Sequence, residues 1–256
     1  MILAIDMGNS NIVVGGLDDN KTYFEERITT DDRKTSLEYA ILLKNILEIH
    51  KVKKNDIEGS IMASVVPPLN APISSAVKKI TGKKPLLVGS GMKTGLNIKM
   101  DNPKTVGGDR IVAAVAANAK YEGPIIIADM GTATTLDVVD HDGNYIGGVI
   151  LPVALNSLVS NTAQLPRISF DVPKRTIGKN TIECMRNGIM LGNAAMLDGL
   201  IDRMTAELGE PATLIATGGM ARFITPLCTH KITYDPDLLL RGLMILYRQN
   251  TETKDA

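Results

Sequence analysis

The chain has 256 residues, and its 28 Lys and Arg balance its 28 Asp and Glu, so the formal net charge is zero. This balance argues against a nucleic-acid-binding scaffold, which usually carries a basic excess. Two cysteines, Cys184 and Cys228, are too few for a disulfide framework. No apolar stretch approaches the roughly 20 residues that span a bilayer, and no charged segment precedes the first apolar run. We therefore expect a cytoplasmic globular protein that binds neither membranes nor nucleic acid.

The first part of the chain predicts three strands and then an alternation of helices and strands. The strands are expected over residues 1–5, 11–17, 22–28, 60–66 and 84–88, and the helices over 36–50 and 70–80. This order, β-β-β-α-β-α-β, resembles the half-unit of the actin-like and hexokinase-like ATPases.

The second part of the chain predicts a similar order after a loop at 89–106 and an alanine-rich helix at 109–121. Strands are expected over 124–128, 134–139, 145–150, 212–216 and 231–234, and helices over 154–164, 181–208, 220–226 and 236–249. The pattern predicts an ATPase-like half at 1–106, a connecting helix at 107–122 and a second half at 123–256.

One short motif occurs twice in the sequence. DMGNS at residues 6–10 returns as DMGTAT at residues 129–134, an offset of 129 − 6 = 123 positions. Each copy follows an apolar run and precedes a second apolar run that ends in a polar turn. A lone copy is explained as well by an ordinary hairpin turn. Two copies at matching places favour a duplicated phosphate-binding reversal.

The chemistry of this motif suits phosphate. At the reversals, Gly8 and Gly131 are expected to use positive φ angles, and the backbone N–H groups would then form an anion-binding nest. Hydroxyl groups of Ser10, Thr132 and Thr134 are further candidate donors. The aspartates that end each first strand, at positions 6 and 129, would repel phosphate, so we expect them to hold a cation that neutralises it.

A second candidate motif, Gly107-Gly108-Asp109-Arg110, opens the alanine-rich helix. An acidic residue at a helix N-terminus is explained equally by capping or by the helix dipole. The functional alternative makes Asp109 the group that orients a hydroxyl and accepts its proton during phosphoryl transfer. Arg110 would hold a carboxylate or phosphate in a bidentate fork.

The Gly-Gly pairs are weaker signals. Gly218 and Gly219 follow an expected strand and precede an expected helix, so their amides are candidates for contacting a nucleotide. A tight strand–helix turn explains them as well. Gly147 and Gly148 are placed by the sequence at the end of a strand and are equally ambiguous.

Together these motifs resemble the type III pantothenate kinases along nearly the whole chain. The matching segments are IDMGNSN (5–11), SVVPP (64–68), KTGL (93–96), DNPKTVGGDRIV (101–112), DMGTATT (129–135), YIGGVI (145–150), LPRI (165–168), IGKNT (177–181), ATGG (216–219) and DPDL (235–238). The resemblance implies an α/β protein with the duplicated actin-like or hexokinase-like ATPase fold (ribonuclease H-like), with two similar halves around a nucleotide cleft.

The resemblance also implies an activity. The γ-phosphate of ATP would be transferred to pantothenate, giving 4′-phosphopantothenate in the first step of coenzyme A biosynthesis. Members of this family are homodimers that use Mg²⁺ and a monovalent cation, K⁺ or NH₄⁺.

The candidate site residues, taken from the motifs and from the resemblance together, fall into three groups. Asp129 would bind the monovalent cation, and Asp6 is the second candidate metal ligand. Pantothenate would contact Gly107, Gly108, Asp109, Arg110 and Thr181, with Asp109 as proton acceptor. The ATP-binding residues would be Asp6, Met7, Gly8, Asn9, Ser10, Asn11, Ile12, Val13, Thr132, Gly218 and Gly219.

Three positions depart from the family pattern. Met100 stands where the family usually has a Tyr that lines the pantothenate pocket, Gly108 replaces the Ala of Gly-Ala-Asp-Arg, and Val153 replaces the Gly of a Pro-Gly pair. Two alternatives follow from them. One is a regulatory protein resembling the Bvg accessory factors, and the other is a kinase of the same fold with a different small-molecule acceptor. The kinase hypothesis expects both aspartate-tipped reversals to face one crevice, with the Gly-Gly-Asp-Arg side chains across from them.

Overall fold

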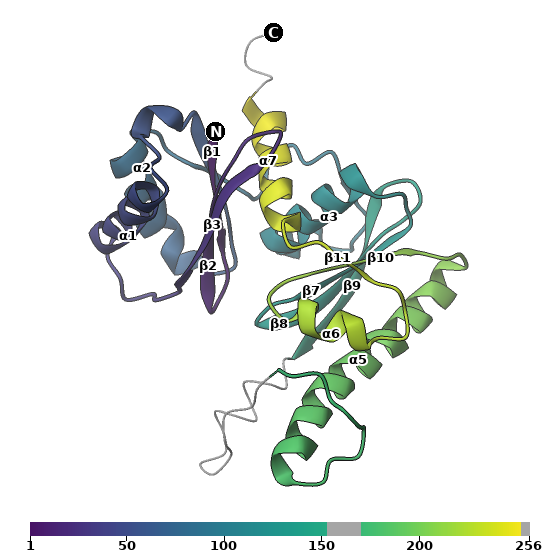
Figure 1. Cartoon of the computed structure of the whole chain (residues 1–256). Coiled ribbons are helices and arrows are strands. Elements are labelled where there is room, and N and C mark those ends of the chain that lie inside the picture. Colours follow the sequence, from purple (N-terminus) through teal and green to yellow (C-terminus); the bar gives the residue numbers. More distant parts are fainter. Residues whose placement is uncertain (153–169, 252–256) are drawn as a thin grey trace. The chain divides into compact units, whose positions relative to one another are not determined.

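The computed structural model describes residues 1–152 and 170–251. The chain forms two compact units (Figure 1). The first contains Met1–Leu96, Asp101–Ala119 and the chain from Asp237 onward, and the second contains Asn97–Met100 and Lys120–Pro236. The helix expected over 154–164, the LPRI segment at 165–168 and Val153 lie outside the described residues.

The first unit is built around a five-stranded sheet with the order β3-β2-β1-β4-β5. Its elements are β1 (Ile2–Met7), β2 (Asn11–Leu17), β3 (Thr22–Thr29), α1 (Ser36–Ile49), η1 (Lys54–Asp56), β4 (Gly59–Ser64), η2 (Pro67–Leu69), α2 (Asn70–Thr81), β5 (Leu86–Leu87), η3 (Pro103–Thr105), α3 (Gly108–Lys120, whose last residue groups with the second unit) and α7 (Leu238–Thr251).

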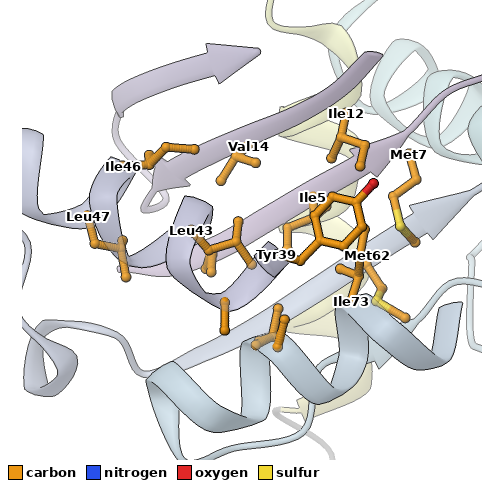
Figure 2. Packing of buried hydrophobic residues seen from close by; sticks show 14 of the residues in the cluster. Ile5, Met7, Ile12, Val14, Tyr39, Leu43, Ile46, Leu47, Met62 and Ile73 are labelled. Carbon is orange, nitrogen blue, oxygen red and sulfur yellow. The ribbon is translucent and has the colours of Figure 1, made fainter. Parts of the chain in front are cut away.

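Alternation along β1 sends side chains to two separate cores, because neighbouring residues of a strand point to opposite faces. Leu3, Ile5 and Met7 pack with α1 and α2, as Figure 2 shows for Ile5 and Met7 beside Tyr39, Leu43 and Ile73. Ile2 and Ala4 pack on the other face, against residues of α3 and α7. Asp6 follows them on this second face and is half-buried.

Local signals explain where the helices of this unit begin and end. Before α1, the Thr35 hydroxyl accepts a hydrogen bond from the Glu38 N–H, and the Glu38 carboxylate accepts one from the Thr35 N–H. This reciprocal capping box satisfies two N–H groups that the helix leaves unpaired. Helix α2 ends at Gly82, whose φ of 81° is the left-handed conformation that glycine adopts without strain.

The second unit contains a six-stranded sheet with the order β11-β10-β7-β8-β9-β6. Its apolar core joins β7, β8 and β10 to α5 and α6, and α5 is the long green helix of Figure 1. The elements are β6 (Asn97–Ile98), β7 (Ile125–Met130), β8 (Ala133–Val139), β9 (Asn144–Pro152), α5 (Thr181–Leu208), β10 (Thr213–Thr217), α6 (Ala221–Ile224), η4 (Thr225–Leu227) and β11 (Thr233–Tyr234).

The sequence repeat corresponds to a structural repeat. Strands β1 and β7 have the same sequence of buried and half-buried positions, and so do β2 and β8. In both units the first strand pairs antiparallel with the second and parallel with a later strand. The two meanders and the helix over 181–208 are confirmed.

Several short elements differ from the sequence predictions. The strands expected over 84–88 and 231–234 are each only two residues long, as β5 and β11. The expected loop at 89–106 contains β6 and η3. The helix expected over 220–226 divides into α6 and η4, and the last helix begins at Leu238 and continues to Thr251.

The two compact units have different boundaries from those expected at residues 106 and 123. Helix α3 groups with the first unit as far as Ala119, and α7 groups with the first unit as well. The reason for α7 is its apolar face, because Leu240, Leu243 and Leu246 pack with Ile2 in the second core of that unit. In the described part of the chain, no helix is both long and apolar enough to cross a membrane.

Candidate active site

The first reversal is a short exposed turn between β1 and β2. Its closing hydrogen bond runs from the Gly8 N–H to the Asn11 carbonyl, 3.0 Å away. Thr30, the residue after β3, holds the turn in place, because its hydroxyl donates to the Gly8 carbonyl at 2.7 Å and its N–H donates to the Ser10 carbonyl at 3.0 Å. Asn9, Ser10 and Asn11 are exposed. A turn that is held rigid while its tip faces solvent suits the binding of an anion by backbone N–H groups.

The expected reason for glycine in the two reversals is wrong. Neither Gly8 nor Gly131 has a positive φ. At Gly8 the reason is close approach, since a Cβ there would lie 3.1 Å from the Asn11 carbonyl oxygen. At Gly131 an added Cβ would meet its nearest atom, the Ala133 carbonyl oxygen, at 3.7 Å, which is an ordinary contact.

Asp6 and Asp109 lie at one edge of the first sheet. Asp6 is near the carboxyl end of β1, which runs parallel to β4, and β4 runs parallel to β5. Val88 continues from β5 at the same end, and Gly108, the first residue of α3, lies beside it. The carboxyl edge of parallel strands is where α/β proteins bind ligands.

The Gly-Gly-Asp-Arg motif holds its carboxylate tightly. The Oδ1 atom of Asp109 accepts a hydrogen bond of 2.9 Å from the Arg110 N–H. A Cβ at Gly107 would lie 2.5 Å from the same oxygen. An alanine at position 107 would therefore displace the carboxylate of Asp109, which folds back over Gly107 at the positive end of the helix.

The two glycines of this motif give opposite predictions. A Cβ at Gly108 would lie 3.5 Å from Cγ1 of Val88, and the backbone has no positive φ there. We expect Gly108→Ala to keep wild-type turnover and to stabilise the protein by about 0.5–1 kcal/mol, because alanine loses less conformational entropy in a helix.

Gly107→Ala is the matched variant, and we expect it to lower turnover by about tenfold or more because its methyl group displaces Asp109. Steady-state rates and thermal unfolding of both variants test this contrast. Equal rates in the two variants would contradict the assigned position of the carboxylate.

The second reversal lies at the carboxyl edge of the second sheet. Asp129 is the next-to-last residue of β7 and pairs in register with Thr217 of the parallel strand β10. The turn is closed by a hydrogen bond of 3.1 Å from the Gly131 N–H to the Ala133 carbonyl. Thr132 is exposed at its tip.

Gly218 packs directly against this reversal. Its φ is 89°, and an added Cβ would lie 2.6 Å from the carbonyl carbon and oxygen of Met130 and 2.7 Å from Oδ1 of Asp129. The Met220 N–H donates to the same Met130 carbonyl at 3.2 Å. The structure therefore joins Gly218 and Asp129 in one arrangement, with Gly219 exposed beside them.

One expected hydroxyl group near Asp129 is buried, and an unexpected one shares the face of Asp129. Thr134, an expected donor, is 3% exposed and pairs with Met130, which points into the apolar core of the second unit. Thr135 lies directly opposite Asp129 instead, and directly opposite residues of an antiparallel pair share a face. Counting the register of the hairpin would have revealed Thr135. A motif alone does not fix that register.

Met100 lies against strand β9 in the second unit. An added Cβ at Gly147, which has a φ of 132°, would lie 3.3 Å from the Met100 sulfur. Lys99 anchors this segment, since its N–H donates to the Tyr145 carbonyl at 2.8 Å and its ammonium group to Asp140 at 3.2 Å. Burial raises the pKa of Asp140, but hydrogen bonds from Asn144 and Lys99 outweigh it, so the pKa is lowered overall.

The second Gly-Gly pair lies within β9, which corrects its expected position at a strand end. A Cβ at Gly148 would lie 2.0 Å from the Leu136 carbonyl oxygen of the neighbouring strand. This glycine is explained by close packing of two backbones.

Thr181 is the first residue of α5 and is exposed. The Asn180 side chain caps the helix by accepting a hydrogen bond of 2.9 Å from the Glu183 N–H. The pKa of Glu183 is lowered, first by a hydrogen bond from the Lys179 N–H. Thr181 thus lies on a firmly capped helix N-terminus in the same unit as Asp129.

The predicted site residues divide between the units. The first holds 6–13 and 107–110, and the second holds Met100, Asp129, Thr132, Thr181, Gly218 and Gly219. Among residues 1–152 and 170–251, no group of three or more His, Cys, Asp or Glu side chains could hold a metal ion. Each carboxyl edge thus combines a turn of backbone amides with carboxylates, Asp6 and Asp109 in the first unit and Asp129 in the second.

Solved structures share this architecture at low identity. A hexokinase of the ROK type from Thermus thermophilus covers 100% of this chain and is covered to 99%, with a TM-score of 0.52 and 14% identity. A Campylobacter jejuni structure, named as a conjectured Baf family transcriptional activator, covers 98% of this chain and is covered to 100%, with a TM-score of 0.59 and 18% identity. These likenesses confirm the duplicated ATPase fold and show the fold alone.

Sequence relatives are far closer. The family model of the type III pantothenate kinases matches residues 2–203. The type III pantothenate kinase of Exiguobacterium sibiricum is 45% identical over 253 residues, which are 98% of this chain and 100% of that protein. The enzyme of that name from Moorella thermoacetica is 42% identical over 254 residues, again 98% of this chain and 100% of the relative. The chain therefore belongs to the type III pantothenate kinase family.

Proposed function

We propose that this protein transfers the γ-phosphoryl group of ATP to the primary hydroxyl group of pantothenate. The product is 4′-phosphopantothenate, the first intermediate of coenzyme A biosynthesis. The observation that carries the proposal is identity of 42–45% to type III pantothenate kinases over 98% of the chain. No comparison supports the regulatory alternative, because the likeness to the Baf structure is one of fold.

Asp109 is the proposed proton acceptor. The hydroxyl oxygen of pantothenate attacks the γ-phosphorus, the bond to the β–γ bridging oxygen breaks, and ADP leaves. The hydroxyl proton passes to a carboxylate oxygen of Asp109. The hydrogen bond from the Arg110 N–H and the contact with Gly107 support this role by fixing the carboxylate. Its main contribution is orientation of the hydroxyl, because a loose transition state requires little basicity.

The remaining roles follow the family motifs. Residues 6–13 form the first phosphate turn for ATP, and Thr132, Gly218 and Gly219 bind the nucleotide from the second unit. Gly107, Gly108, Met100 and Thr181 line the pantothenate site. Arg110 binds the pantothenate carboxylate, because a guanidinium group matches that anion in a bidentate pair.

Two cations complete the proposal. The donor sets fit cations that also bind phosphate oxygens, since Asp6 and Asp129 each offer a carboxylate beside a turn of backbone amides. Asp6 would hold Mg²⁺, directly or through water, together with the ATP phosphates. Asp129 would hold K⁺ or NH₄⁺. Both cations supply positive charge that neutralises the phosphates. A homodimer and a cytoplasmic location, where ATP is available, belong to the same proposal.

Met100 motivates a second candidate, a kinase of this fold with another small acceptor. Met100 stands at the position where the family usually has a Tyr, and its sulfur lies close to Gly147. We expect pantothenate to outcompete pantetheine and simple sugars in a phosphorylation assay, and Met100→Tyr to lower the KM for pantothenate by about fivefold with little change in kcat. That factor corresponds to one added hydrogen bond of about 1 kcal/mol. A higher kcat/KM for any competing alcohol would favour the second candidate.

A further inference from the structure

A buried carboxylate lies on the same face of the second sheet as Asp129. Asp137 is 1% exposed, and both of its oxygens accept hydrogen bonds from hydroxyl groups. The Tyr145 hydroxyl donates to Oδ1 at 2.6 Å, and the Thr135 hydroxyl donates to Oδ2 at 3.0 Å. Burying a charged group is costly unless it is hydrogen-bonded, so such a group requires an explanation.

Thr135 connects this carboxylate to the candidate cation site. Thr135 and Asp129 are directly opposite each other in the β7–β8 pair, which places their Cβ atoms about 4.5–5.5 Å apart on one face. A hydroxyl group has one proton and two lone pairs. Because the Thr135 hydroxyl donates its hydrogen to Asp137, its oxygen can present only lone pairs towards Asp129.

A hydroxyl oxygen that presents lone pairs on the same face as a carboxylate is suited to binding a cation. K⁺ and NH₄⁺ are bound by oxygen atoms, as are other hard cations. A hydroxyl oxygen beside a carboxylate adds a ligand without adding charge, which suits an ion of single charge.

The duplicated half supplies an internal comparison. In the β1–β2 pair, Val13 lies opposite Asp6, the position that Thr135 has opposite Asp129. Two residues further along β2 is Gly15, at the position of Asp137, where the side chain of Leu240 fills the space. The same hairpin therefore forms in the first unit without a threonine or a buried carboxylate, so the hairpin geometry by itself does not explain Asp137.

We infer that Asp137 is a positioning residue, which turns the Thr135 hydroxyl so that its oxygen binds the monovalent cation together with Asp129. This inference rests on the proposed function for the identity of the cation. Partners of metal ligands commonly change metal affinity by 10–100-fold when mutated. The prediction concerns cation affinity, so the quantity to measure is the K⁺ concentration for half-maximal activity.

The test is a titration with KCl at constant ionic strength, balanced with choline chloride. We expect Asp137→Asn and Thr135→Val each to raise the K⁺ concentration for half-maximal activity by about tenfold or more. Thr135→Ser, which keeps the hydroxyl group, should stay within about threefold of the wild type. The double variant should resemble Thr135→Val alone, because residues that act through one another are not additive.

A second readout requires no catalysis. K⁺ should raise the Tm of the substrate-free wild-type protein above its value in choline chloride, since a ligand of the native state stabilises it. The Asp137→Asn and Thr135→Val variants should need about tenfold more K⁺ for the same shift. Should Asp137→Asn fail to fold, the comparison of Thr135→Val with Thr135→Ser decides the question by the same two readouts.

Three results would overturn the inference. The first is a wild-type Tm that is the same in KCl and in choline chloride. The second is an Asp137→Asn variant whose Tm is lowered while its K⁺ concentration for half-maximal activity is unchanged. The third is a double variant in which the effects of the two substitutions add. Wild-type ADP release with pantothenate in the same buffers tests the proposed function separately. Its absence beside a normal K⁺-dependent Tm shift would reject the substrate and leave the cation site supported.

Discussion

Asp109→Asn should lower kcat by about 10²–10⁴-fold, the usual contribution of a positioned acid or base. Asparagine has the shape of aspartate, and its carbonyl oxygen can still accept the hydrogen bond that the Arg110 N–H makes at 2.9 Å. The contact with Gly107 is kept as well. The folded structure is therefore retained, while the amide can no longer take a proton from the substrate hydroxyl.

The measurement is the rate of ADP release at saturating ATP and pantothenate, with thermal unfolding recorded for each protein. Asp142→Asn is the matched control, because it makes the same chemical change in the exposed turn before β9. A kcat of Asp109→Asn within about threefold of that control would reject Asp109 as the proton acceptor.

Gly218→Ala should lower kcat/KM for ATP by about 10–100-fold. The backbone there has a φ of 89°, and the added methyl group would meet the Met130 backbone at 2.6 Å and Oδ1 of Asp129 at 2.7 Å. A left-handed conformation costs an alanine about 1–2 kcal/mol. The larger effect is displacement of the second reversal, because a shift of about 1 Å in a catalytic arrangement can cost about 100-fold in rate.

Gly209→Ala separates these two effects. Gly209 also has a positive φ, 75°, at the end of α5, but an added Cβ would have no neighbour within 4 Å. We expect the Gly209→Ala variant to lose about 1 kcal/mol of stability and to keep the wild-type turnover. If both variants lose activity equally, backbone strain explains the loss and the proximity of Gly218 to Asp129 does not.

The parts of the fold that depend on local sequence were predictable. The two meanders and α5 were found because alternation, turn residues and capping act within a few residues of one another. Strands β5, β6 and β11 have only two residues each, and β6 forms through pairing with Asn144 and Tyr145, far away in the sequence. The grouping of α7 with the first unit depends on packing against β1, which composition cannot reveal.

The residues of the candidate site that belong to short motifs were predictable, and those that depend on strand pairing were not. The motifs identified Asp6, Asp109 and Asp129, because each lies at the end of a strand or the start of a helix. Thr135 and Asp137 were missed because their importance depends on strand register and on a hydrogen bond to the hydroxyl group. The positive φ expected at the two reversals belongs instead to Gly218, at the end of another strand.

The central claim, that this chain is a pantothenate kinase, is tested most directly by ADP release from the purified wild-type protein as K⁺ is titrated. The account predicts release that requires pantothenate, saturates with K⁺ or NH₄⁺, and yields 4′-phosphopantothenate in equal amount to ADP. ADP release that is the same with and without pantothenate, at every K⁺ concentration, would contradict it.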